Sequence, residues 1–263
     1  MKIYSKNNYR KNASNIIGKP AETEWTNMEV AQEKLVEIET LESYYLEKFY
    51  FLLKFYEDVM FEGFLTKEKI KDDWKDKWDP LEEGKGISGF STGAERIVYA
   101  FFNAHTIWTP NSAPVGSDIF FETKDAFVHV DLKTVQTRNI GDFKEDIFVG
   151  NNQTSYNGNI TIQGKKELRP YDNAALPWIY GNSGNPKPCL TYFITILYEE
   201  KNLNILCIAI LSMPNGMLER VYKEDVLKAG KNPGKIRFNF SRTPDFRLLQ
   251  NKKRIMVIYF DKN

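Results

Sequence analysis

Residues 114–133 read Pro-Val-Gly-Ser-Asp118-Ile-Phe-Phe-Glu-Thr-Lys-Asp-Ala-Phe-Val-His129-Val-Asp131-Leu-Lys133. The stretch predicts two strands, at 117–121 and 126–134, separated by a tight turn. Side chains alternate between the faces of a strand, so the apolar residues 128, 130 and 132 point one way. His129, Asp131 and Lys133 point the other way. A hairpin would then bring Asp118 beside Asp131 and Lys133.

Two carboxylates and an ammonium group form a set that suits phosphodiester hydrolysis. Carboxylate oxygens hold Mg²⁺, which keeps water and phosphate oxygens in its shell. The cation polarises the phosphate and lowers the pKa of a bound water. A neighbouring lysine holds the attacking water and offsets charge that builds up on the phosphorus. The alternative for the same residues is a solvated sheet face with an Asp–Lys cross-strand pair.

The chain before this hairpin predicts helices. Apolar residues recur at steps of three or four from Met28 to Val59, which indicates one long helix, or two with a bend, ending near Gly63. The apolar stripe needs a partner, either the body of the domain or a second copy of the protein. Residues 66–89 predict a loop or short helix, and Ser91 or Thr92 begins a second helix over Ala94–Phe102.

The chain after the hairpin predicts more strands. Residues 136–188 have little periodicity and predict a long functional or disordered loop. Residues 189–198 and 203–211 predict paired strands, and 234–241 and 254–260 predict two more. We therefore expect an α/β fold in which helices flank a central mixed β-sheet, with a helical N-terminal extension.

Composition bounds the class of protein. The chain has 263 residues, 42% of them apolar, which is enough for a packed core. No apolar run approaches the roughly 18–20 residues of a membrane span, and the N-terminus lacks the apolar core of a signal peptide. Cys189 and Cys207 form no metal motif and no disulfide framework, so we expect a cytoplasmic protein without a membrane partner.

The charge distribution is uneven although the net charge is +1. Up to Lys133 there are 17 Lys and Arg against 23 Asp and Glu, and after it 19 against 12. The basic second half allows a surface for a polyanion. Ordinary fluctuation along a neutral chain is the alternative.

The Asp118…Asp131-x-Lys133 hairpin, after a helix that bears Glu95, resembles the core of the PD-(D/E)XK nucleases. Within this class, the chain resembles the BglI/SfiI-like type II restriction endonucleases of the EcoRV branch. The resemblance covers about two thirds of the chain, from the helix of Glu95 to the C-terminus. Residues 1–85 have no such likeness, and Ser117 stands where the family often has proline. Matching blocks lie at 130–135, 152–158, 161–164, 211–216 and 234–240.

The resemblance implies roles for the residues of the hairpin. Asp118 and Asp131 would be the metal ligands, with Mg²⁺ as the cofactor, and the Leu132 carbonyl would be a further ligand. Lys133 would be the catalytic lysine. The helical Glu95 would orient a water or a second metal; the alternative is a first-turn Glu favoured by the helix dipole.

The resemblance also places base-reading residues on the predicted strand 234–241. Basic side chains read guanine, and Asn or Gln reads adenine, in the major groove. A solvated strand face is the alternative. Three candidates share one face of this strand, and three more lie in the 136–188 loop: Lys235, Arg237 and Asn239, then Asn152, Gln153 and Gln163.

These observations favour a site-specific endonuclease for double-stranded DNA. A homodimer, or a tetramer, would cut a palindromic or interrupted-palindromic site, one strand for each subunit. We expect residues 1–85 to serve dimerisation or support, and 86–263 to form the nuclease domain with a DNA-recognition loop at 136–188. The alternatives are a repair or junction nuclease that reads DNA shape, and a DNA-binding protein without catalysis.

Overall fold

The computed structural model describes residues 28–70, 85–105, 110, 117–162, 167–171, 174–181, 185–200, 203–230, 236–240 and 253–262. Its helices are α2 (Met28–Phe55), α3 (Glu57–Ile70), α5 (Lys85–His105), α6 (Gly141–Lys144) and α7 (Glu219–Tyr222). No helix of the described ranges is long and apolar enough to cross a membrane.

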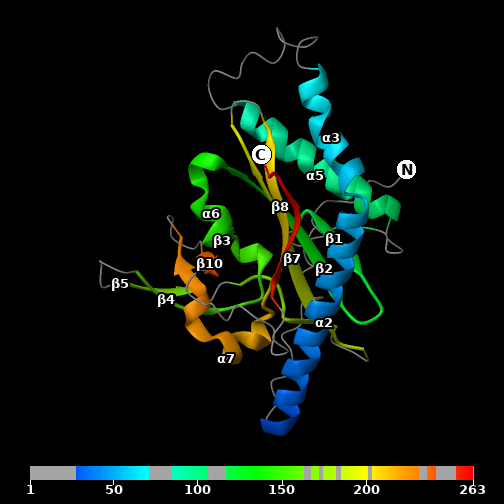
Figure 1. The fold of residues 1–263 in the computed structure, drawn as a ribbon. Coiled ribbons are helices and arrows are strands. Elements are labelled where there is room, and N and C mark those ends of the chain that lie inside the picture. Colours follow the sequence, from blue (N-terminus) through cyan, green and yellow to red (C-terminus); the bar gives the residue numbers. More distant parts are fainter. Residues whose placement is uncertain are drawn as a thin grey trace, which may run out of the picture.

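The strands form a central sheet and two smaller ones (Figure 1). The main sheet has the order β1-β2-β7-β8-β11, with β6 paired to β7. The β2–β7 pair is parallel and the other pairs are antiparallel, so the mixed sheet expected from the sequence is confirmed. The central sheet contains β1 (Ile119–Glu122), β2 (Phe127–Gln136), β6 (Ile179–Tyr180), β7 (Lys187–Tyr198), β8 (Ile205–Met213) and β11 (Ile255–Phe260).

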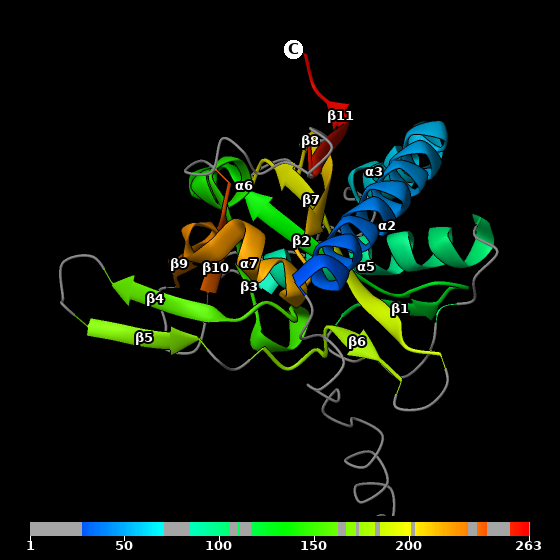
Figure 2. The same cartoon turned by 90° about the horizontal axis from the view of Figure 1, so that it is seen from below.

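The smaller sheets contain the remaining described strands. A three-stranded sheet has the order β3-β10-β9, and a hairpin joins β4 to β5. The hairpin extends away from the body of the chain (Figure 2). Residues 136–188 are therefore not the long loop that we expected, because β3 is stabilised by pairing with β10, some ninety residues later. The strands are β3 (Asp146–Val149), β4 (Gly158–Ile162), β5 (Glu167–Tyr171), β9 (Leu227–Ala229) and β10 (Ile236–Asn239).

The helices differ from the sequence prediction at two ends. The long helix bends at Tyr56 but continues past Gly63, because its buried stripe continues: Met60 and Phe64 both pack in the core. The helix α5 begins at Lys85, before the expected cap. Ser91 lies inside this helix, where its hydroxyl donates to Glu95 Oε1 at 3.5 Å, one turn ahead.

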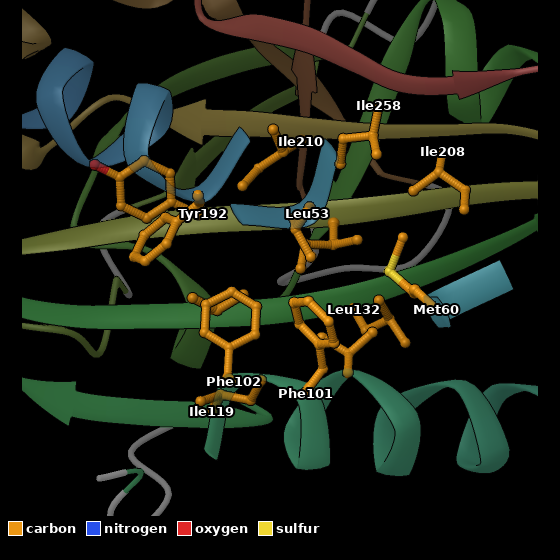
Figure 3. Close-up of a cluster of buried hydrophobic side chains, with 14 of the residues drawn as sticks. Leu53, Met60, Phe101, Phe102, Ile119, Leu132, Tyr192, Ile208, Ile210 and Ile258 are labelled. Carbon is orange, nitrogen blue, oxygen red and sulfur yellow. The ribbon is translucent and has the colours of Figure 1, made fainter. Parts of the chain in front are cut away.

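One face of the central sheet is covered by α2, α3 and α5, and the layer between them is the larger core (Figure 3). Leu53 and Met60 come from the first two helices, Phe102 from α5, and Leu132 and Tyr192 from the sheet. All five are 7% exposed or less. Burying each such side chain stabilises the fold by roughly 1.5–3 kcal/mol. The first helix is thus an integral part of the larger core.

The opposite face of the sheet packs on the three-stranded sheet and α7. Phe193 from β7 and Leu211 from β8 contact Ile147 of β3 and Phe238 of β10 in a second core. The central sheet is therefore buried on both sides, and the elements that follow β2 are fixed against it.

A buried ion cluster, here called the Arg254 cluster, joins α2 to the sheet. Arg254 is 0% exposed, and its Nη2 lies 2.7 Å from Glu42 Oε2 and 3.4 Å from Glu39 Oε1. Tyr222 donates to Glu39 at 2.5 Å, and the backbone N–H of Asn215 donates to Glu42 at 2.8 Å. Each carboxylate of this cluster therefore accepts at least two hydrogen bonds.

Candidate active site

The two acids of the hairpin meet at the end of the β1–β2 pair. Ile119 is opposite Val130 in the antiparallel register, so Asp118, directly before β1, comes beside Asp131. The Asp118 carboxylate accepts a hydrogen bond from the Leu132 backbone N–H at 2.7 Å. Asp118 is exposed, whereas Asp131 is only 3% exposed. The pair thus spans the boundary between solvent and the protein interior.

Lys133 completes the group. Its Nζ lies 2.5 Å from Asp131 Oδ2, and the lysine side chain is 19% exposed. The same ammonium group donates to Gln153 Oε1 at 3.0 Å. The structure therefore brings Asp118, Asp131 and Lys133 together, as the alternation of β2 predicts.

His129 lies on the same face of β2 as Asp131 and Lys133, and hydrogen bonds hold it in its buried position. Its Nδ1 lies 3.2 Å from the Ser117 hydroxyl, and its Nε2 lies 3.1 Å from the Tyr180 hydroxyl. The histidine is 0% exposed. These contacts hold the residue that directly precedes Asp118, so His129 supports the site as a neighbour.

Electrostatics at the site disfavour the charged form of Asp131. Burial raises the pKa of Asp131 to about 7 from its usual 3.8; Lys133 opposes this shift, and repulsion from Asp118 adds to it. Lys133 therefore offsets only part of what burial costs the carboxylate. A cation bound between the two acids would relieve this strain.

The donor set fits a hard divalent cation. Asp131 Oδ2 is buried, and its contact with Lys133 lacks hydrogen-bond geometry, so the oxygen has no hydrogen-bond partner among the described residues. Within the same ranges, no three residues of the His, Cys, Asp and Glu types gather as a ready metal cage. Mg²⁺ suits such a sparse site, because it binds through one or two carboxylates and keeps water and phosphate oxygens.

Glu95 approaches from α5. Burial raises its pKa, and repulsion from Asp118 adds to the shift, while Ser91 and Lys133 oppose it. The charges of Asp118 and Lys133 thus act on the Glu95 carboxylate.

The residues expected to read bases on β10 are placed differently from one another. Arg237 pairs with Asp142 and lies 2.8 Å from Asp146, so two carboxylates hold its guanidinium group. Asn239 is only 3% exposed, so the expected exposed polar face is wrong at this position. The reason is that β10 is the middle strand of its sheet, between β3 and β9. Lys235 lies outside the described residues.

The loop candidates also differ. Asn152 is exposed on the turn η4 (Asn151–Gln153), whereas Gln153 is half-buried and folds back onto Lys133. Nothing in the sequence indicated this contact, because twenty residues separate the partners and only the fold of the turn joins them. Gln163 lies outside the described residues.

A mixed sheet that brings Asp118, directly before β1, beside Asp131 and Lys133 on β2 has the arrangement expected from the resemblance to the PD-(D/E)XK nucleases. Residues 34–202 match the N-terminal domain of the type II restriction enzyme MwoI, and residues 205–260 match its central domain. The chain belongs to this family of type II restriction enzymes. Its activity is that of the family, the site-specific cleavage of DNA. A junction nuclease or a non-catalytic DNA-binding protein, the alternatives from the sequence, does not fit this membership.

Solved structures show the same fold. The restriction endonuclease BglI bound to its DNA recognition sequence superposes with a TM-score of 0.67 at 18% identity, over 97% of this chain and 96% of that one. The tetrameric restriction endonuclease SfiI bound to cognate DNA gives 0.64 at 17% identity, over 87% of each chain. No curated protein matches the chain in sequence.

Proposed function

We propose that this enzyme hydrolyses double-stranded DNA at a palindromic or interrupted-palindromic site, with Mg²⁺ held by Asp118, Asp131 and the Leu132 carbonyl. The observation that carries this proposal is the buried Asp131 Oδ2, which lacks a hydrogen-bond partner in the described ranges and lies beside a second carboxylate and an ammonium group. Burial and repulsion from Asp118 disfavour the charged form of Asp131 more than Lys133 favours it, and a bound divalent cation would offset the difference.

The residues divide the chemistry between them. The bound cation supplies polarisation of the scissile phosphate and a water of lowered pKa. Asp118, open to solvent, would hold the cation where a phosphate of the DNA can reach it. Lys133 has three N–H donors, and its hydrogen bond to Gln153 uses one of them, so donors remain for the attacking water or a phosphate oxygen. Its positive charge then stabilises the charge that develops on the phosphate. Glu95 would orient a water beside Asp118.

Base reading is proposed for β10 and the η4 turn. Arg237 has the guanidinium geometry that pairs with guanine, and to read a base it must exchange Asp142 or Asp146 for the base edge. Asn152 is exposed and free of such competition from a carboxylate in the described contacts. We keep Lys235, Asn239 and Gln163 as proposed DNA contacts, with Asn239 requiring movement from its buried position.

A dimer is proposed because two active sites related by a twofold axis match a twofold DNA sequence. The inner face of α2 supports the sheet, and its outer face carries exposed apolar side chains. Phe51 and Phe55 are 69% and 68% exposed and stack on each other. We propose that a second copy covers this face; a tetramer would need a further surface. We also place the enzyme in the cytoplasm with its substrate.

Plasmid digestion tests the proposed function. The protein with Mg²⁺ should give discrete fragments, and run-off sequencing of their ends should return one short symmetric sequence. Replacing Phe51 and Phe55 by Ser should leave a monomer in sedimentation analysis. A smear of fragments would contradict the proposed site specificity. Cutting that persists in excess chelator would contradict the proposed requirement for a metal ion.

A further inference from the structure

We infer that Gln153 is a positioning residue for the reaction: its side-chain carbonyl holds the Lys133 ammonium group where the phosphate must meet it. The inference rests on the proposed catalytic role of Lys133. It gives Gln153 a task inside the active site in place of the base contact suggested by its loop position.

The contacts place Gln153 between the lysine and the backbone. Its Oε1 accepts from Lys133 Nζ at 3.0 Å and from the Gly150 N–H at 2.9 Å. The ammonium group is thus held on two sides, by Asp131 at 2.5 Å and by Gln153. A lysine side chain has about four rotatable bonds, and it loses much rotamer freedom when its ammonium group is fixed. The hydrogen bond to Gln153, added to the ion pair with Asp131, fixes the direction in which the other N–H groups of the lysine point.

The turn that carries Gln153 is itself held in place. The Gln153 N–H donates to the Gly150 carbonyl at 3.0 Å, while its side chain returns to the Gly150 N–H. A Cβ on Gly150 would lie 2.8 Å from Asn152 Oδ1 and 3.3 Å from Gln153 Oε1. Glycine therefore leaves room for the Gln153 side chain to fold back onto the Gly150 N–H. On the other side of the turn, Ala175 N–H donates to the Asn151 carbonyl at 2.7 Å. Gln153 is therefore a fixed acceptor.

The amide also suits the electrostatics. A third carboxylate beside Asp118 and Asp131 would add repulsion to a pair that already repels. A neutral amide oxygen orients the ammonium group without neutralising it, so Lys133 keeps its charge for the phosphate. Without the amide, Asp131 alone would direct Nζ, and the ammonium group would turn toward that carboxylate.

The test separates positioning from DNA binding. Gln153→Met keeps the side-chain length and removes the acceptor, whereas Gln153→Glu keeps an acceptor oxygen. Single-turnover cutting of a fragment with the cognate site should fall roughly tenfold to a hundredfold in the Met variant, as for a misplaced catalytic group. The Glu variant should recover only part of that loss, because its carboxylate still orients the ammonium group but adds repulsion beside Asp118 and Asp131. DNA affinity, measured with Ca²⁺ in place of Mg²⁺, should stay within about twofold of the original in both.

A matched control is Gln136→Ala, on the same strand as Lys133. Gln136 is buried and donates to the Tyr198 hydroxyl at 3.2 Å, so its loss removes one buried hydrogen bond without touching the lysine. This variant should lower the melting temperature and leave the cutting rate unchanged. A Met variant of Gln153 that cuts as fast as the original, or that loses DNA affinity as much as rate, would overturn the inference.

A double substitution distinguishes this inference from the proposed function. The Lys133→Ala variant should still cut DNA slowly with Mn²⁺. Adding Gln153→Met to it should change that rate by less than about threefold, because the effects of substituting two residues that act as a unit do not add. A further large loss would overturn the positioning role alone. A Lys133→Ala variant that cuts normally would instead remove the proposed function, whatever Gln153 does.

Discussion

The Arg254 cluster and the active site both bury a carboxylate next to a cation. Burial raises the pKa of Glu42 in the first and of Asp131 in the second, so both acids face the same cost. In the Arg254 cluster, Glu42 accepts from Arg254 and from the Asn215 N–H. In the active site, Asp131 Oδ2 has no such donor in the described ranges.

This difference distinguishes buried charged groups that stabilise the fold from buried charged groups that bind a ligand. When every carboxylate oxygen of a buried ion cluster accepts a hydrogen bond, the cluster is rigid, and here it holds α2 against the sheet. An oxygen left unsatisfied is a source of instability unless a ligand completes it. The two clusters should therefore respond in opposite ways when their charges are removed.

The largest effect is expected at Arg254. Replacing it by Ala leaves Glu39 and Glu42 buried without a cation, which should lower the free energy of unfolding by about 3–5 kcal/mol. Denaturant titration measures the change. Combining Arg254→Met with Gln at both acids should restore most of the loss, because no charge then remains. An Arg254→Ala variant as stable as the original would show that this cluster does not stabilise the fold.

At the active site, the expected loss is in rate. Asp131→Ala or Lys133→Ala should bind DNA but cut it roughly a hundredfold to a thousandfold more slowly, since each removes part of the transition-state charge stabilisation. Single-turnover cutting and DNA affinity, measured side by side, check this. Near-normal cutting by either variant would remove these residues from the site.

The comparison predicts that losing charge at Asp131 stabilises the metal-free protein. The folded pKa of about 7 lies above the usual 3.8, so the protonated form favours folding, and stability falls as the pH rises from about 4 through 7. Asp131→Asn should lack this fall and gain on the order of 1–2 kcal/mol at pH 8. Melting curves in chelator across this pH range measure it. A lower melting temperature for the Asn variant at pH 8 would show that the orphan oxygen carries no strain.

The smallest effect is expected at Arg237, where two carboxylates already hold the guanidinium group. Arg237→Ala should reduce discrimination against one altered base pair about tenfold, within the range of a single bidentate contact, and spare the rate on the cognate site. Cutting of a panel of single-base variants measures it. Unchanged discrimination would make the Arg237 contacts structural, like those of Arg254.

The sequence predicts the site better than its surroundings. Alternation along β2 places Asp131 and Lys133 on one face, and a tight turn brings Asp118 to them, because these are local rules. The Arg254 cluster joins α2 to Arg254, directly before β11, and no local pattern indicates such partners. The same holds for β3, a four-residue strand that depends on β10, and for Gln153, whose contact with Lys133 depends on a folded turn.

The parallel pairing of β2 with β7 has a consequence for how specificity can change. Because the two strands run the same way side by side, the chain between them must leave the catalytic sheet and return to its starting edge. Everything from β3 to β6 is accommodated within that excursion. Within it, the β4–β5 hairpin pairs only with itself among the described strands, so a change in its length would leave the β2–β7 register and Lys133 in place, and DNA contacts there could change around an unaltered cutting centre.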